Sequence, residues 1–216
     1  MAGDLLYRSA RWVLRAVLVR YFRVRAYGID RIPASGPVLL AINHLSMLDP
    51  LLIGVVVPRP VHFMAKEELF RYPVLRQLLP KVHAFPVRRG EADREAIHQA
   101  LRRLQEGQVV GVFPEGTRSQ DGRLLEIQGG TALLALKSGA PILPIAITGT
   151  ERAMPRGAYW PRRVRVEIRV GKLIHPETSP CQHAGRDRIH STSRRLAEEL
   201  GALLEQAHVA LGPGSG

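Results

Sequence analysis

The sequence predicts an α/β domain with a mixed, largely parallel central sheet that is flanked by helices. Two patterns predict this fold. From residue 37 onward, short apolar runs of strand length alternate with segments of helical periodicity, as in a parallel sheet with crossover helices. One later run, residues 163–170, instead alternates apolar and charged residues. A chain of 216 residues, 45% of them apolar, can bury one sizeable core.

Residues 4–25 predict an amphipathic helix in front of this domain. At about 100° per residue, one face collects Leu6, Ala10, Val13, Leu14, Val17 and Tyr21, and a second face collects Arg8, Arg11 and Arg15. A basic face beside an apolar stripe is typical of a helix that lies in a membrane interface. Packing of the same stripe on the domain core is the alternative, and one helix can do both.

The elements expected next are strands and helices in alternation. The strands cover residues 38–42, 62–65, 84–87, 109–113 and 142–148. The helices cover residues 51–57, 67–79, 93–105 and 131–138, with Gly107 closing the third and Gly139 and Pro141 stopping the fourth.

Residues 163–170 predict a strand of a different kind. Val164, Val166, Ile168 and Val170 share one side, and Arg163, Arg165, Glu167 and Arg169 share the other. We expect one face in water, a place near a sheet edge and an antiparallel neighbour. Residues 185–210 predict a C-terminal helix. The chain is thus divided into an N-terminal helical element at 1–25, a main domain at 26–211 and a flexible tail at 212–216.

The chain is strongly basic, with 31 Lys and Arg against 19 Asp and Glu and a formal charge of +12. This excess predicts an anionic partner, which can be nucleic acid, an anionic membrane surface or a phosphorylated substrate. Most of the basic residues are arginines, whose planar fork suits bidentate phosphate contacts. A generally basic surface without a specific partner is the alternative.

Two other functional classes receive no support from the composition. The only cysteine, Cys181, excludes an internal disulfide framework and a Cys-rich zinc site. The apolar segment nearest to a membrane span, residues 38–57, contains Asn43, His44 and Asp49, and charge at mid-span argues against insertion. We therefore expect no metal site and no transmembrane helix.

An imidazole and a carboxylate follow the first apolar run of the domain. His44 and Asp49 form an HX4D pattern in the stretch NHLSMLD. Positions five apart do not share a helix face, so we expect the pair to span a strand-to-helix turn at the carboxyl end of a strand, where open α/β sheets place their sites. A carboxylate on one imidazole nitrogen fixes the tautomer and leaves the other nitrogen to take a proton from a hydroxyl. A buried histidine satisfied by a helix-capping aspartate is the alternative.

A second polar group follows the run 109–113. Its loop, Pro114-Glu115-Gly116-Thr117-Arg118-Ser119, contains a glycine that lets the main chain approach a ligand and an arginine suited to phosphate. Lys66 and the pair Arg88-Arg89 add cations at the ends of two other expected strands. An ordinary turn among surface charges is the alternative.

In this order, the blocks NHLSMLD, AKEELF, FPVRRG, FPEGTRS and PILPIAI resemble the PlsC-like glycerolipid acyltransferases, the 1-acylglycerol-3-phosphate acyltransferase family. The resemblance covers about residues 25–175, and its first and fourth blocks are highly specific as a pair. Two departures are visible: the chain has Ile127-Gln128 where the family commonly has Phe-Lys, and Arg88 before Arg89 adds a cation where an acidic or polar residue is frequent.

The resemblance implies roles for particular residues. His44 would be the general base, Asp49 its orienting partner, and Lys66 a lysine near the reacting thioester. The residues that would bind the acceptor's phosphate or shape its pocket are Arg89, Glu115, Gly116, Thr117 and Arg118, and Pro141 and Pro144 match the acyl-donor region.

The implied reaction is acyl transfer from acyl-CoA or acyl-ACP to the hydroxyl of 1-acyl-glycerol-3-phosphate, giving phosphatidic acid without metal or cofactor. The implied partners are an anionic membrane surface, the lysophospholipid acceptor and the acyl donor, with the protein peripheral on the cytoplasmic face of the cell membrane. A relative with another acceptor, such as glycerol-3-phosphate, a lysophospholipid or a lyso-aminolipid, is the main alternative. A basic nucleic-acid-binding module is a distant one, because only 6% of the residues are aromatic and no recognised nucleic-acid motif is present.

Overall fold

The computed structural model describes residues 14–73, 76–77, 79, 83–87, 94–176 and 185–212, with only the main chain of Lys66. It forms a seven-stranded sheet in the order β1-β7-β6-β2-β5-β3-β4. The strands are β1 (Arg25–Tyr27), β2 (Val38–Ile42), β3 (Val61–Lys66), β4 (Phe85–Val87), β5 (Val109–Val112), β6 (Ile142–Thr148) and β7 (Glu167–Val170). Pairing is parallel except between β6 and β7, so the predicted mixed, largely parallel sheet is confirmed.

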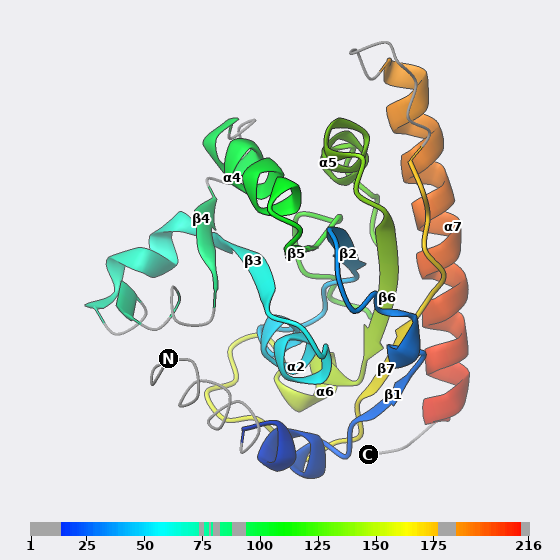
Figure 1. Ribbon diagram of the computed structural model, residues 1–216. Coiled ribbons are helices and arrows are strands. Elements are labelled where there is room, and N and C mark those ends of the chain that lie inside the picture. The colour runs from blue at the N-terminus through cyan, green and yellow to red at the C-terminus, as the bar shows by residue number, and fades with distance from the viewer. Residues whose placement is uncertain are drawn as a thin grey trace.

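Helices cover both faces of the sheet (Figure 1). On one face lie α4 (Arg94–Gln105), α5 (Gly130–Ser138) and α7 (Arg186–Leu211), which pack on Leu39 and Ala41 of β2. On the other face lie α2 (Asp49–Val56), the short α6 (Thr150–Ala153) and a helical segment at residues 14–21, which pack on Val38, Leu40 and Ile42. Because β2 is buried on both faces, its sequence is a continuous apolar run rather than an alternating one.

Most predicted elements have the expected type and place. The helix predicted at 51–57 begins two residues earlier, at Asp49. The one predicted at 67–79 begins as the 3-10 helix η2 (Glu67–Arg71). Another 3-10 turn, η1 (Ile29–Arg31), follows β1. Among the described residues, no helix combines the length and apolarity of a membrane span.

The predicted helix at 4–25 is wrong at its carboxyl end. Helical structure stops at residue 21, Arg23 adopts a left-handed conformation with φ of 44°, and β1 then pairs with β7 at the sheet edge. Leu18, Val19 and Phe22 pack on the core, whereas Val17 of the predicted apolar stripe is 57% exposed. The stripe's described members, Leu14, Val17 and Tyr21, are thus in water. Its remaining members, and Arg8 and Arg11, lie outside the described residues.

The strand at 163–170 is antiparallel to β6 and next to the edge strand, as predicted, but it is shorter and has no wet face. Glu167 is fully buried, and its carboxylate accepts hydrogen bonds from Arg165 at 3.4 Å and Arg169 at 2.8 Å. Helix α7 covers this face, which the strand's own alternation could not reveal. A buried carboxylate held by two guanidinium groups satisfies the usual requirement for burying charge.

His62, on β3, provides a pH-dependent contribution to stability. Arg103 of α4 donates to His62 Nδ1 at 3.0 Å, and the His83 ring lies 4.9 Å away. Burial, with help from the charges of Arg103 and His83, lowers the pKa of His62 from 6.5 to about 4. Between pH 6.5 and about 4, His62 binds a proton in the unfolded chain but not in the folded protein. Lowering the pH through this range therefore favours unfolding.

We expect the free energy of unfolding to fall by up to about 1.4 kcal/mol per pH unit from this one group as pH drops from about 6.5 to about 4. Denaturant titrations of the wild type and His62→Gln across this range should show a flatter pH profile for the variant. His98→Gln, which changes an exposed histidine of α4, is the control and should keep the wild-type profile. Identical profiles for all three proteins would contradict the assignment.

Candidate active site

Polar side chains gather where β2, β5 and β6 end. These strands are neighbours and run parallel, so their carboxyl ends share one edge of the sheet. The register places Ala41 beside Val112 and Ile42 beside Ile145. The loops that follow therefore start side by side, which is where an open α/β sheet places its site.

His44 and Asp49 converge in the turn between β2 and α2, as predicted. His44 Nδ1 lies 2.9 Å from Asp49 Oδ2. The imidazole stacks on the Phe113 ring, with centroids 4.0 Å apart. These contacts hold the ring from its edge and from one face, and no hydrogen bond from a described residue occupies the other ring nitrogen, Nε2.

Asp49 is 0% exposed, and its carboxylate accepts several hydrogen bonds. Besides His44, Oδ2 accepts the main-chain N–H groups of Leu45 at 2.7 Å and Ser46 at 2.8 Å. Oδ1 accepts the Thr150 hydroxyl at 2.6 Å. Asp49 is the first residue of α2, yet these partners precede the helix or come from α6. The helix-capping alternative therefore does not describe its contacts.

A tight turn at Gly149 brings Thr150 to Asp49. Gly149 joins β6 to α6 with φ of 93°, a left-handed conformation that favours glycine. A Cβ at this position would lie 2.3 Å from the Arg165 carbonyl oxygen, so any side chain would displace the main chain. The close approach of the 165–166 segment thus depends on this glycine, and so does the place of the hydroxyl next to it.

Glu115 connects the two loops of the site. Its Oε1 accepts the His44 main-chain N–H at 2.7 Å and its Oε2 accepts the Leu125 N–H at 2.9 Å. Burial raises the pKa of this carboxyl above its ordinary value, against the opposing effect of the two N–H donors. Because both oxygens are occupied, Glu115 shapes the site by holding the loops together.

The loop after β5 lies against His44. The Ser119 N–H donates to the His44 carbonyl at 2.8 Å. Arg118 is the residue directly before Ser119 and so lies next to this contact. Gly116 has φ of 67°, and its N–H donates to the Phe113 carbonyl at 3.0 Å in a tight turn. Gly116 and Thr117 are exposed, and Arg118 is half-buried with no ion pair to a described acidic residue. The edge thus combines the His44–Asp49 pair with an accessible cation.

A sequence model of the family described as "Acyltransferase" matches residues 23–148, which is more than half of the chain and includes His44, Asp49, Phe113, Glu115 and Arg118. The chain belongs to this acyltransferase family.

Individual relatives agree with this membership. The 1-acyl-sn-glycerol-3-phosphate acyltransferase of Bacillus subtilis is 29% identical over 79% of this chain and 83% of its own length. The Limnanthes douglasii protein of the same name is 35% identical over 59% of this chain and 46% of its own length, so the chain spans about half of that relative. A lyso-ornithine lipid O-acyltransferase of Pseudomonas aeruginosa is 31% identical over 67% of this chain and 54% of its own length.

A solved structure shares the fold. The crystal structure of the 1-acyl-sn-glycerophosphate (LPA) acyltransferase PlsC from Thermotoga maritima superposes with a TM-score of 0.71 over 96% of this chain and 84% of that chain. The sequence identity is 21%, so this similarity shows the fold alone.

Several other predicted residues of this acyltransferase are described only in part or lie outside the described residues. Lys66 is the last residue of β3 and pairs with Val87, two strands away from β2 in the same sheet. Its side chain, together with Arg88, Arg89 and Cys181, lies outside the described residues. Pro144 is in β6 beside Ala41, and Pro141 precedes that strand.

Sequence reasoning missed three residues of the site. Asn43 forms two hydrogen bonds with the main chain of Ile147, at 2.9 and 2.7 Å, and so ties the end of β2 to β6. Thr150 reaches Asp49 across 101 positions of sequence, and Phe113 stacks on His44. Only Asn43 offered a signal, because a polar amide ends an apolar run directly before His44.

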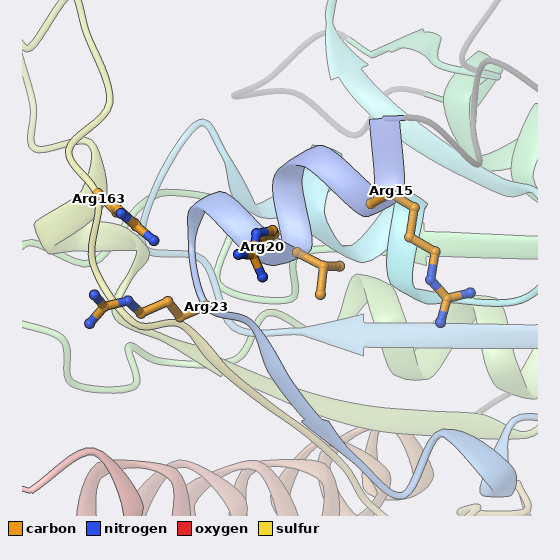
Figure 2. A pocket seen from close by; sticks show the side chains of 6 residues that line it. Arg15, Arg20, Arg23 and Arg163 are labelled. Carbon is orange, nitrogen blue, oxygen red and sulfur yellow. The ribbon is translucent and has the colours of Figure 1, made fainter.

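The surface beside His44 is partly apolar. Met47, in the turn between His44 and Asp49, is 58% exposed, and Leu51 of α2 is also exposed. A separate cavity of about 550 Å³ is lined by Arg15, Ala16, Val19, Arg20, Arg23 and Arg163 and shares no residue with the His44–Asp49 pair (Figure 2). Within the described ranges, no three or more His, Cys, Asp or Glu side chains are grouped as metal ligands.

Proposed function

We propose that this acyltransferase moves a fatty acyl group from an acyl thioester to the free hydroxyl of 1-acyl-glycerol-3-phosphate, giving phosphatidic acid. The proposal rests on one observation above all: a buried carboxylate holds an imidazole at 2.9 Å beside an arginine-bearing loop. The printed names of the Bacillus and Limnanthes relatives support the same reaction.

In the proposed mechanism His44 is the general base. Asp49 accepts a hydrogen bond from the Nδ1–H of His44, which leaves Nε2 to take the proton of the acceptor hydroxyl. The hydroxyl oxygen attacks the thioester carbonyl carbon, a tetrahedral intermediate forms, and the C–S bond then breaks. The imidazolium returns the proton to the leaving thiolate, so the products are an ester and a free thiol. Asp49 stabilises the transient imidazolium.

The intermediate's oxyanion requires donors. We assign this role to Lys66 or to main-chain N–H groups at the carboxyl edge, a contribution of about 3 to 4 kcal/mol for one donor in comparable sites. The donor is acyl-CoA or acyl-ACP, used as a co-substrate, and the proposed chemistry requires no metal and no cofactor.

Arg118 is proposed to bind the acceptor's phosphate, with Arg89 and the main chain at Gly116 and Thr117 as further contacts. A half-buried guanidinium without a described acidic partner has donors to offer a phosphate. Glu115 positions this loop against His44 through its two main-chain N–H donors. An ionised carboxylate is acceptor-only, so Glu115 offers no hydrogen bond to the phosphate. Holding the phosphate orients the hydroxyl toward Nε2.

Replacing Arg118 with alanine is expected to raise KM for a phosphate-bearing acceptor at least about tenfold, the equivalent of one lost charge-assisted contact. Steady-state kinetics with Arg123→Ala as the control separate this effect from a general loss of charge. Arg123 lies in the same loop, is exposed and pairs loosely with Asp121 at 3.8 Å. Equal KM changes in both variants would show that Arg118 has no specific place in phosphate binding.

A second candidate is transfer to a different acceptor. Two observations support this candidate: the similarity to a lyso-ornithine lipid O-acyltransferase, and Ile127-Gln128 in place of the Phe-Lys that is common in the family. Thiol release measured with lysophosphatidic acid, glycerol-3-phosphate, a lysophospholipid and lyso-ornithine lipid decides between them. We expect lysophosphatidic acid to be used best, and use of phosphate-free acceptors alone would overturn the assignment.

We also propose that the protein is peripheral on the cytoplasmic face of the cell membrane. The exposed apolar side chains Leu14, Val17 and Tyr21 share a helix with Arg15 and Arg20, as expected for an interfacial helix. The formal charge of +12 favours an anionic bilayer, where the proposed lysophospholipid acceptor resides.

A further inference from the structure

The segment between α6 and β7 presents two large aromatic side chains to solvent. Tyr159 is 92% exposed and Trp160 is 84% exposed, in the sequence Arg156-Gly-Ala-Tyr-Trp-Pro-Arg-Arg163. Aromatic residues this large are usually mostly buried, and exposed ones beside cations mark an interaction site or a membrane interface. Neither the fold nor the proposed chemistry uses them.

This segment lies beside the helical residues 14–21. The Tyr21 hydroxyl donates to the Pro161 carbonyl at 3.0 Å, and Arg163 lines the same 550 Å³ cavity as Arg20 and Arg23. Figure 2 shows Arg163 on the later segment, close to the end of the helix where Arg20 and Arg23 lie. The exposed apolar residues of the helix and the aromatic pair therefore belong to neighbouring parts of the surface.

The cavity has the charge of an anion site. Four of its six lining residues are arginines and none is acidic. Arg20, Arg23 and Arg163 form no ion pair with a described residue, so their N–H donors can bind an anion from outside. Among the described residues, Arg23 is one of two non-glycine residues with positive φ, at 44°. Such backbone strain persists where the surrounding structure enforces it, often at binding sites.

Short contacts connect this surface to the His44–Asp49 pair. The Arg162 N–H donates to the Ala153 carbonyl at 2.7 Å, and the Ser46 hydroxyl donates to the Met154 carbonyl at 3.2 Å. Thr150, at the start of the same α6, donates to Asp49. The segment with Tyr159 and Trp160 therefore follows α6 directly, and Thr150 of α6 contacts Asp49.

We propose that residues 14–23 and 156–163 form one membrane-docking surface, in which Tyr159 and Trp160 enter the lipid interface and the arginine-lined cavity binds the phosphate of an anionic phospholipid headgroup. The aromatic pair favours a bilayer as the partner rather than an acidic carrier protein, because tryptophan and tyrosine beside arginine are typical of the headgroup region of a membrane. Only the purpose of this docking, delivery of lipid to His44, rests on the proposed function.

Trp160 can report its own insertion, because the chain has two tryptophans and the other is Trp12. In Trp12→Phe, the remaining fluorescence should shift to shorter wavelength on adding phosphatidylglycerol vesicles, and brominated lipid should quench it. Phosphatidylcholine vesicles should produce a much smaller response. Fluorescence that stays at its aqueous wavelength on saturating anionic vesicles would overturn the role of the aromatic segment.

The arginine cavity is tested by sedimentation with the same vesicles. Arg20→Gln/Arg163→Gln should bind phosphatidylglycerol vesicles at least about tenfold more weakly, since each cation near an anionic surface contributes to attraction. Arg194→Gln/Arg195→Gln removes the same charge from exposed positions of α7 and should change binding less than about threefold. If both double variants bind the vesicles equally weakly, net charge alone explains the effect, and the proposed phosphate site in the cavity is overturned. Thermal melting confirms that both are folded.

The rival partner is tested by titrating acyl-ACP against the same variants. If Arg20→Gln/Arg163→Gln loses acyl-ACP binding but keeps vesicle binding, the surface belongs to the acyl donor and the membrane proposal is overturned. These measurements require no turnover, so their failure is distinguishable from failure of the His44 chemistry.

Discussion

Replacing His44 with alanine is expected to lower turnover by at least about a hundredfold, the usual contribution of a general base. The imidazole is held by Asp49 at 2.9 Å and by the Phe113 ring, and no other described imidazole shares this edge. Removing the ring leaves no group to take the hydroxyl proton as the oxygen attacks. Thiol release under saturating substrates measures the loss, and KM for the acceptor should change little.

The matched control is His98→Ala, which removes an exposed imidazole from α4 and should retain full turnover. Circular dichroism and thermal melting should show that His44→Ala is folded, because Asp49 keeps its bonds from Leu45, Ser46 and Thr150. A folded His44→Ala protein with near-normal turnover would refute the general-base mechanism.

The second large effect is expected on stability, from Asp49→Ala. The buried carboxylate is the shared acceptor for His44, Thr150 and two main-chain N–H groups. Its removal leaves these donors unpaired in the core, which is expected to lower the free energy of unfolding by about 3 to 5 kcal/mol. Turnover should also fall, since His44 loses the partner that fixes its tautomer.

Two substitutions of Thr150 test one of these hydrogen bonds separately. Thr150→Val leaves Oδ1 without its hydroxyl donor and should cost about 1 to 3 kcal/mol, whereas Thr150→Ser should restore most of the loss. Asp30→Ala, an exposed aspartate in η1, is the control and should change stability by less than about 0.5 kcal/mol. Urea denaturation measures the four variants and the wild type. An Asp49→Ala protein as stable as the wild type would show that the hydrogen bonds around this carboxylate contribute nothing net.

Local pattern was sufficient for the central sheet and for the pair at its edge. The apolar runs at β2, β5 and β6 predict buried parallel strands because a strand with both faces covered has no reason to alternate. Polar residues directly after such a run must lie at the sheet's carboxyl edge, so the meeting of His44 and Asp49 followed from spacing and strand direction. These features depend on neighbours a few positions apart.

Tertiary packing decided the rest. Glu167 was expected in water because its strand alternates, but α7 covers that face from a distant part of the chain. The helix predicted at 4–25 extends to Arg25, yet residues 25–27 form β1 because the neighbouring β7 offers main-chain groups for pairing. The exposure of Val17 likewise depends on Phe22 and Leu18 taking the place on the core.

The sequence by itself therefore determined the strands β2 to β6, the helices that alternate with them along the chain and the two residues proposed for proton transfer, since each follows from local pattern. Only the tertiary structure decided which groups support them: Thr150 on Asp49, Glu115 between two loops, and Tyr159 and Trp160 beside the N-terminal helix. The contacts of Glu115 with His44, of Thr150 with Asp49 and of Tyr21 with Pro161 join residues 71, 101 and 140 positions apart. No periodicity along the chain records which distant segments will pack together.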